Sequence, residues 1–316
     1  MSLSNVTKSS SNSGVNVSSL RVRVRWADWR TLAQTLIVLF KLRVVFLLLM
    51  AATGGAFMAA HGWPGLSTML LVWLTGGSAA AGASAWNQYL ERNKDGKMGR
   101  THKRPLVTGA IANPNWVPYV ATFMILAPVL AVLPTNPALS FWLFTGAFIY
   151  VGIYTIWLKP RTLLNVVVGG AAGSAAVLSG SAATGDWASS GALLLALVLF
   201  LWSPFHFWSL ALLYRDEYAR ADVPMLPTQT SPRQAAWWVL SHTFPTGLAG
   251  LALATFQPLG LVYFLPMLFI TGDLMWRNIR LIHDPSPIHA RNMFISSNIY
   301  LLVLLLFICL DSVLPF

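Results

Sequence analysis

The sequence predicts an all-α polytopic membrane protein with nine transmembrane helices. Hydrophobic residues make up 56% of its 316 residues and charged residues only 10%, and the mean hydropathy is +0.61, outside the range of ordinary soluble domains. A bilayer span needs about 20 apolar residues and must satisfy its backbone hydrogen bonds internally. The chain lacks the polar and apolar alternation of a membrane β-barrel, so we expect helical spans.

Nine apolar stretches are separated by polar or proline-containing breaks. They cover residues 34–60, 64–90, 114–133, 138–158, 163–183, 188–213, 235–256, 258–276 and 293–314. The break near Gln257 and Pro258 is the weakest, but a single span over 235–276 would be too long for one crossing. Paired glycines such as Gly54 and Gly55 lie among small residues inside these stretches, and we expect them at close helix contacts.

The basic residues test the count of nine, because short cytoplasmic loops retain Lys and Arg while translocated loops lack them. With a cytoplasmic N-terminus, all 21 basic residues fall on one side: before residue 44 and within 92–104, 159–161, 215–233 and 277–291. The net charge of +11 therefore forms a one-sided field that suits lipid headgroups of the bilayer and an anionic substrate. Loops this close to the bilayer make nucleic acid a poor partner.

The two ends of the chain differ in composition. Residues 1–30 are Ser- and Asn-rich, then basic, without an apolar run long enough for a signal peptide. We expect a flexible cytoplasmic tail over 1–30, a membrane domain over 31–316, and a bacterial inner (plasma) membrane location. An Arg- and Ser-rich tail with few acids leaves the mitochondrial inner membrane as an alternative.

A first charged cluster lies in "NQYLERNKDGKMGRTHKRPL", residues 87–106. Asn87, Glu91 and Asp95 are spaced i, i+4, i+8, so they share one face if the helix continues past the bilayer surface. Carboxylate and amide oxygens suit Mg²⁺, whose shell is commonly completed by substrate phosphates. Nearby donors for a phosphate are Arg100, Lys103 and Arg104. Taken alone, the cluster also fits a solvated helix end with surface ion pairs.

A second acidic cluster lies on the same predicted side, in "YRDEYARADVPMLP" at residues 214–227. Its presence favours a metal site over a solvated helix end. It contains Asp216, Glu217 and Asp222 beside Arg215 and Arg220. Two facing acidic loops above an apolar bundle predict a clamp for Mg²⁺ and the head of an isoprenyl diphosphate, and hence prenyl transfer. A transporter is the alternative from another class, but transporters place ion-binding carboxylates near the midplane.

The two clusters resemble the paired signatures of the UbiA-type intramembrane prenyltransferases. The first segment is similar to N-x-x-x-D-x-x-x-D-x-x-M-x-R-T-x-x-R-P-L, and "WSPFHFWSLALLYRDEYARADVPMLP" is similar to the second signature. The R-T-x-x-R-P-L, H-F-W and P-M-L-P elements are typical of the protohaem IX farnesyltransferase (haem O synthase) branch. With "KLRV", "LKPRTLLNVVVGGAAG" and "SSNIYLLVLLLFICLD", the resemblance extends over nearly everything after the tail.

The resemblance implies a nine-helix bundle and a Mg²⁺-dependent transfer of farnesyl from farnesyl diphosphate to the vinyl group of haem B. Water addition then gives haem O for terminal oxidases. It leaves open whether a haem A synthase docks nearby. By position, the metal and catalytic candidates are Asn87, Glu91, Asp95, Asp216 and Glu217, and the substrate-binding candidates are Arg43, Arg100, Lys103, Arg104, Lys159, Tyr214, Arg220 and His206.

Several positions depart from the pattern of the family. Glu91 replaces the usual Asp, and the order of Asp216 and Glu217 is inverted, so either of the latter two is a candidate ligand. Ala176 and Val177 stand in place of a usual Pro pair. These changes keep charge but alter reach and cavity shape, so a quinone precursor remains the alternative acceptor. His206, whose flanks match in "PFHFW", is expected to contact or orient the haem.

Overall fold

The computed structural model describes residues 29–314, and within that range the chain is helical without a β-strand, which confirms the all-α prediction. The longer helices are α1 (Trp29–Leu39), α2 (Leu42–Ala60), α3 (Leu66–Asp95), α5 (Val117–Val132), α6 (Pro137–Phe148), η3 (Ile149–Leu158), α8 (Ala171–Ala183), α9 (Ser190–Leu213), α12 (Pro232–Ala252), α13 (Leu261–His283) and α14 (Pro287–Asp311). Short helices join them: α4 (Pro105–Thr108), η2 (Pro114–Trp116), α7 (Asn165–Gly169), α10 (Arg215–Arg220), α11 (Leu226–Gln229) and η4 (Leu253–Thr255).

Seven helical segments within 29–314 are long and apolar enough to cross a bilayer, which indicates an integral membrane protein. They are Leu42–Ala60, Leu66–Asp95, Pro114–Val132, Pro137–Leu158, Asn165–Ala183, Ser190–Leu213 and Pro287–Asp311. Helices α12 and α13 occupy the other two predicted stretches, but they carry polar residues such as His242, Asp273 and Arg277. The count of nine spans is therefore not confirmed and stays a prediction.

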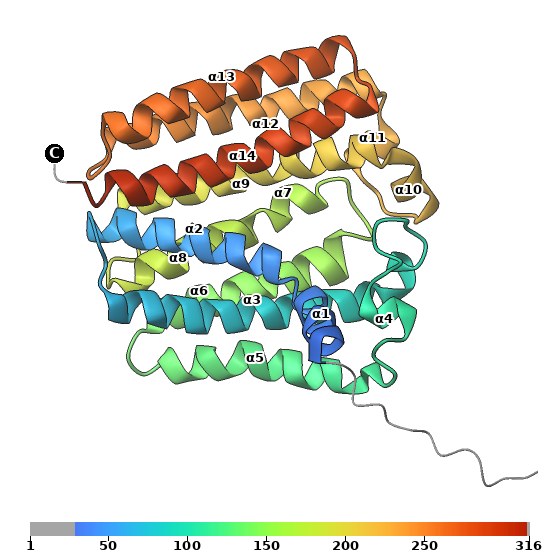
Figure 1. The fold of residues 1–316 in the computed structure, drawn as a ribbon, viewed down its shortest axis with the longest axis horizontal. Helices are drawn as coiled ribbons and strands as arrows, with labels where there is room; N and C mark the ends of the chain where they lie inside the picture. Colours follow the sequence, from blue (N-terminus) through green and yellow to red (C-terminus); the bar gives the residue numbers. More distant parts are fainter. Residues whose placement is uncertain (1–28, 315–316) are drawn as a thin grey trace, which may run out of the picture.

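The first predicted stretch, 34–60, is not one continuous helix. Lys41 takes the left-handed conformation (φ 48°, ψ 48°) and separates α1 from α2. In Figure 1, α1 does not continue the line of α2 but is seen in front of α3, beside α4. The predicted tail falls outside the described residues except Trp29 and Arg30, which already belong to α1.

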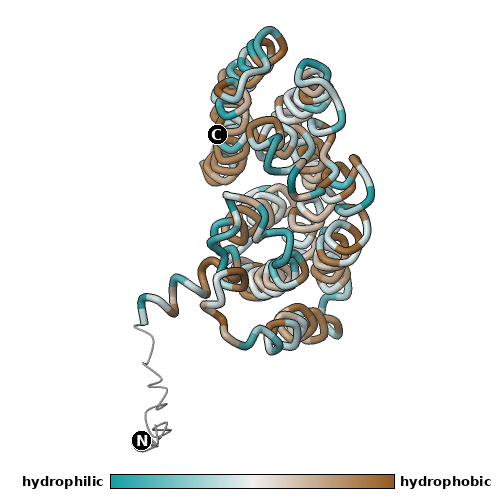
Figure 2. The backbone as a smooth tube through the Cα atoms, turned by 90° about the vertical axis from the view of Figure 1, so that its right-hand side faces the viewer, coloured by the Kyte–Doolittle hydropathy of each residue, from teal (hydrophilic) through white to brown (hydrophobic). Residues whose placement is uncertain are grey.

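Helix α9 lies at the centre of the bundle, because it packs on α2, α8, α12 and α14. The connections at one end of the bundle include the basic loop after α3, α4, α10 and α11, whereas the described chain ends at the other end (Figure 1). Figure 2 looks onto that basic end and shows hydrophilic segments there, with hydrophobic helices around them. The fold thus brings the two charged clusters to the same end, as predicted.

Helices α2 and α8 approach each other backbone to backbone. A Cβ atom on Gly55 would lie 2.0 Å from the Val177 carbonyl oxygen, and one on Gly180 would lie 1.7 Å from the Ala52 carbonyl oxygen. Neither backbone atom can move aside as a side chain can. The close packing predicted for Gly55 is confirmed, and Gly180 is its counterpart on the facing helix.

Gly180→Ala is therefore expected to destabilise the fold by about 3 kcal/mol or more, at the upper end of the usual cost of overpacking. Gly173→Ala on the same helix is the control, because its Cβ would have Leu199 Cβ as nearest neighbour, at an ordinary 3.8 Å. Unfolding of the two variants in detergent measures the difference. Equal stability of both would contradict the close approach of α2 and α8.

Candidate active site

The polar face of α3 begins the site. Asn87, Glu91 and Asp95 are 1%, 9% and 5% exposed, although two of them carry charge. Helix α3 contains 30 residues, so it is about 45 Å long and outruns the roughly 30 Å hydrocarbon core. Its last turns thus reach the basic end, and the i, i+4, i+8 spacing puts the three side chains on one buried face, as the sequence predicts.

Each buried carboxylate on α3 has a cationic partner from another part of the chain. Lys159, just after η3, places Nζ 2.5 Å from Glu91 Oε1, and Arg104, just before α4, places Nη1 2.5 Å from Asp95 Oδ2. Both cations are themselves largely buried, at 19% and 17% side-chain exposure. A buried charge persists only when it is paired, so these partners make the buried carboxylates possible.

A third cation reaches the same face through the break between α1 and α2. Lys41 Nζ donates to Asn87 Oδ1 at 2.5 Å and to the Tyr150 hydroxyl at 3.2 Å, and Asn87 Nδ2 donates to Thr155 Oγ1 at 3.0 Å. Tyr150 and Thr155 both lie on η3, a π-helical stretch. Such stretches occur frequently at functional sites. The left-handed turn at Lys41 therefore lets its ammonium group reach polar partners inside the bundle.

Two stacked tyrosine rings lie next to the lysines of this cluster. The rings of Tyr150 and Tyr154 lie 5.8 Å apart with an interplanar angle of 11°. Lys41 Nζ lies 5.8 Å from the centroid of the Tyr150 ring, and Lys159 Nζ lies 5.4 Å from that of Tyr154. Each ammonium group is thus attracted to the negative face of a ring. The aromatic pair helps to keep two positive charges in a buried place.

The two lysines differ in the pKa of their ammonium groups. Burial, followed by the charge of Arg104, lowers the pKa of Lys41 to about 7. Burial also acts to lower the pKa of Lys159, but the carboxylate of Glu91 more than offsets it, and the pKa is raised. With Lys41, Arg104 and Lys159 against two carboxylates, the cluster favours an added anion, which would restore full charge to Lys41.

The side chain of Glu217, in the second acidic loop, contacts the backbone of the first loop. The Arg100 backbone N–H donates to Glu217 Oε2 at 3.4 Å, and a Cβ on Gly99 would lie only 3.1 Å from Glu217 Oε1. At the rim, Lys97 Nζ lies 4.0 Å from Asp222 Oδ2, and both side chains are mostly exposed. The facing arrangement predicted for the two clusters is thus observed, with Glu217 as the carboxylate that turns toward the first loop.

Other predicted site residues lie at the periphery of this arrangement. Those with exposed side chains are Arg43, Arg100, Lys103, Asp216 and Arg220. Tyr214 is half-buried where α9 ends and packs on the main hydrophobic core. The structure therefore brings together Asn87, Glu91, Asp95, Arg104 and Lys159, and leaves the roles of the outer residues as predictions.

His206 lies where α9 meets α14 and makes no hydrogen bond or ion pair with the carboxylates among the described residues. Its Nδ1 lies 2.8 Å from Ser297 Oγ, the Trp202 ring stacks on it at 4.1 Å, and Phe294 lies 4.7 Å away. The ring is 8% exposed. This surrounding gives His206 a packing role, and its contact with haem stays a prediction.

Three side chains of the buried cluster are absent from the sequence-based candidates: Lys41, Tyr150 and Thr155. Lys41 begins "KLRV", a segment that carries the family resemblance, yet the sequence favours Arg43 as its basic candidate. The signal for the other two was weak, since they are hydroxyl groups inside an apolar stretch. Only the packing of η3 on α3 shows that Thr155 contacts Asn87 and that Tyr150 contacts Lys41.

Lys41→Met is expected to lower prenyl transfer by about 100-fold, because it removes a buried cation and leaves Asn87 Oδ1 without its donor. Arg43→Met is the matched control, since Arg43 is exposed and makes no hydrogen bond or ion pair within residues 29–314. Steady-state rates of both variants, normalised to folded protein, provide the comparison. A larger loss in the Arg43 variant would reverse the assignment.

The residues of the site fit a divalent metal that arrives with its substrate. Within the described range, no group of three His, Cys, Asp or Glu side chains forms a preformed cage. Mg²⁺ does not need one, because it keeps several waters and is often held by one or two carboxylates plus phosphate oxygens. Glu91 and Asp95, with Asn87 beside them, supply such oxygens, and their paired cations are the groups a diphosphate would attract.

Comparison with known proteins agrees with this architecture. The model of the UbiA prenyltransferase family matches residues 47–304. A protoheme IX farnesyltransferase of Metallosphaera sedula is 37% identical over 273 residues, which cover 86% of this chain and 94% of the relative. One from Paramagnetospirillum magneticum is 37% identical over 276 residues, covering 87% of this chain and 96% of the relative.

Solved structures share the fold at low identity. A chain from a study of digeranylgeranylglyceryl phosphate synthase has a TM-score of 0.72 at 14% identity and covers 90% of this chain and 99% of its own length. A UbiA homolog from Archaeoglobus fulgidus bound to DMAPP and Mg²⁺ has a TM-score of 0.61 at 14% identity, covering 87% and 99%. Family model, relatives and fold agree, and the chain belongs to the UbiA prenyltransferase family.

Proposed function

We propose that this protein transfers the farnesyl group of farnesyl diphosphate to the vinyl group of haem B, and that water addition completes haem O. The observation that carries the proposal is the buried cluster of Glu91, Asp95 and three cations at the basic end of an apolar bundle. Relatives named protoheme IX farnesyltransferase, 36–37% identical over most of the chain, support the choice of acceptor.

The cations of the cluster bind the diphosphate. Arg104 presents a planar guanidinium that can donate two parallel hydrogen bonds to phosphate oxygens, and Lys41 and Lys159 act as point charges. As the bond between farnesyl C1 and the diphosphate oxygen breaks, negative charge grows on the leaving group. Donors already fixed in a water-poor place stabilise that charge without reorganising, which lowers the barrier to ionisation.

The oxygens of Asn87, Glu91 and Asp95 would hold Mg²⁺ together with the diphosphate, and a bound Mg²⁺ would act as a Lewis acid toward the leaving group. Glu217 would complete the clamp from the facing loop, because its carboxylate contacts the backbone at Gly99 and Arg100. The exposed side chain of Asp216 makes it the weaker candidate of the pair. In structures of the family, prenyl diphosphate and Mg²⁺ are bound together.

The apolar helices below the cluster shelter the farnesyl cation from water until the electron-rich vinyl group attacks. Attack forms the new carbon–carbon bond and moves the positive charge to the adjacent carbon of the former vinyl group. Addition of water there, with release of one proton, gives the hydroxyethylfarnesyl side chain. The overall exchange consumes one water and releases one diphosphate.

We assign the basic end to the cytoplasmic side, because short loops that retain Lys and Arg stay there. This orientation puts the diphosphate site on the side where a soluble anion would be met. A bacterial plasma membrane is the proposed location, and a haem A synthase is a candidate partner that would take up the product.

The direct test incubates the purified protein with haem B, farnesyl diphosphate and Mg²⁺ and separates haem products by chromatography. Haem O is the expected product. A parallel reaction replaces haem B with a quinone precursor such as 4-hydroxybenzoate. Prenylation of that acceptor without haem O formation would overturn the proposed acceptor while keeping the prenyltransferase class.

A further inference from the structure

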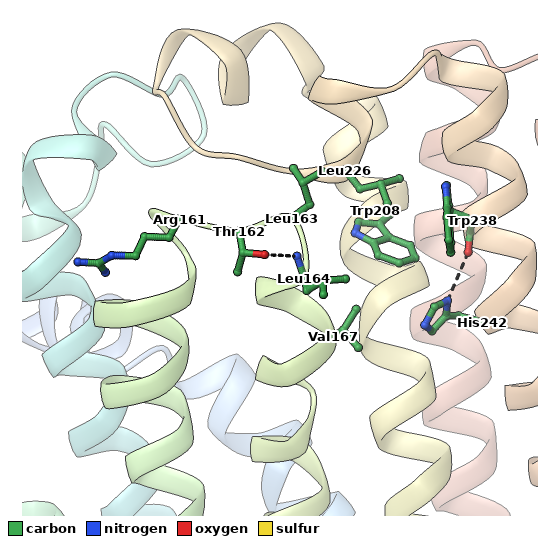
Figure 3. Close-up of a pocket in the computed structure, with 9 residues that line it drawn as sticks. All are labelled: Arg161, Thr162, Leu163, Leu164, Val167, Trp208, Leu226, Trp238 and His242. Atoms are coloured by element: carbon green, nitrogen blue, oxygen red, sulfur yellow. Dashed lines mark hydrogen bonds between the residues drawn. The ribbon is translucent and has the colours of Figure 1, made fainter.

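A pocket of about 490 Å³ opens on the side of the bundle between α7, α9, α11 and α12 (Figure 3). Its walls are mostly apolar and include Leu164, Val167 and Leu226, with Trp208 and Trp238 as aromatic walls. This volume lies within the range of small-ligand sites, about 300–1,000 Å³. None of the residues in the carboxylate cluster lines it, so the pocket is distinct from the candidate active site.

The pocket contains one buried hydrogen-bond donor without an acceptor. Trp208 is 1% exposed, and its Nε1 has no partner within the described residues. Figure 3 shows the ring at the pocket wall with its nitrogen on the side that faces α7. A buried indole N–H usually has a partner, as Trp202 on the same helix does, donating to the Ser297 carbonyl oxygen at 2.8 Å. The geometry points to an acceptor supplied by a ligand.

The donor lies near one end of α9, a helix long and apolar enough to span a bilayer. Trp208 is five residues before the end of α9 at Leu213, which puts it about 8 Å inside the helix end. The interfacial layer on each side of the hydrocarbon core is roughly 5–8 Å thick. Trp237 and Trp238, 55% and 49% exposed on α12, fit the aromatic belt at this level. Ester carbonyl groups of phospholipids lie at this depth.

Arg161 lies at the edge of the pocket, but Figure 3 shows its guanidinium directed away from Trp208. Its Nη1 donates to the carbonyl oxygens of Ile156 and Trp157 at 3.0 and 2.8 Å. A ligand that fits the pocket therefore has a carbonyl oxygen for the Trp208 donor and an apolar chain for the walls.

We propose that this pocket binds one bilayer phospholipid, whose acyl-ester carbonyl accepts a hydrogen bond from Trp208 Nε1. The acyl chain lies on Leu164 and Val167. The occupant enters sideways from the bilayer between α7 and α12. This site stands independently of the reaction, because the prenyl diphosphate cluster shares no residue with it.

The test titrates the purified full-length protein in detergent with dioleoylphosphatidylglycerol or with its diether counterpart, which lacks the ester carbonyls, and counts bound lipid by native mass spectrometry. Wild-type protein is expected to bind the ester lipid about fivefold more tightly, as one hydrogen bond predicts. Trp208→Phe is expected to abolish that preference. Trp237→Phe, an exposed neighbour outside the pocket, is expected to keep it.

A second variant tests the pocket even if the Trp208 variant misfolds. Val167→Phe narrows the pocket without touching the donor and is expected to weaken binding of both lipids. Equal binding of ester and diether lipids by wild-type protein, or unchanged binding by the Val167 variant, would overturn the proposal. Displacement of the ester lipid by haem B would also overturn it and would assign the pocket to the acceptor.

Discussion

Asp95→Asn is expected to reduce haem O formation by about 1,000-fold or more. The substitution keeps the size of the side chain but removes the negative charge that would face Mg²⁺ and that pairs with Arg104 at 2.5 Å. Losing one preorganised electrostatic group commonly costs 100- to 1,000-fold in rate, and losing a metal ligand as well places the loss at the upper end. Product formation from haem B and farnesyl diphosphate measures the effect.

The control for Asp95 is Asp222→Asn. Asp222 is an acid in the facing loop, but its side chain is 86% exposed and lies 4.0 Å from Lys97, so its loss is expected to change the rate less than about twofold. Because Asp95→Asn leaves Arg104 without its carboxylate, unfolding in detergent must accompany the assay. Full activity of folded Asp95→Asn protein would reject the role of α3 in the clamp.

Chelation of divalent cations is expected to abolish turnover without unfolding the protein. Turnover is lost because the leaving diphosphate loses its Lewis acid. The fold is expected to survive, because Glu91 and Asp95 are already neutralised by Lys159 and Arg104 without a metal. Activity and the unfolding temperature, measured before and after chelation and again after addition of Mg²⁺, test both halves. Turnover that persists in chelator would exclude the metal-assisted step.

When metal-depleted protein is titrated with Mg²⁺, Glu217→Gln is expected to raise the Mg²⁺ concentration needed for half-maximal rate by about tenfold, because it weakens the facing half of the clamp. Asp216→Asn is the matched neighbour, one residue away with an exposed side chain, and it is expected to leave that concentration unchanged. The opposite ranking would assign the facing ligand to Asp216, an alternative that the inverted order of the two acids leaves open.

The sequence also misled in one place, at the start of the first apolar stretch. The mean hydropathy of residues 34–60 predicts one span, since the two basic residues Lys41 and Arg43 change the average of a long apolar run little. The structure breaks the helix at Lys41 and turns its ammonium to Asn87, 46 positions later in the chain. A contact of that sequence separation leaves no mark on local pattern, so Arg43 and Lys41 could not be told apart before the helices were packed.

The sequence by itself determined the helical class, the membrane setting, the side on which the charges gather and the face of α3 that carries Asn87, Glu91 and Asp95. These features depend on composition and on the helical repeat, which are local properties of the chain. Only the tertiary structure decided which cation pairs with which carboxylate, that Glu217 rather than Asp216 turns inward, and that His206 is enclosed by Trp202 and Phe294. Those outcomes depend on how helices distant in sequence pack together, because a buried charge or ring takes its environment from the neighbours that packing supplies.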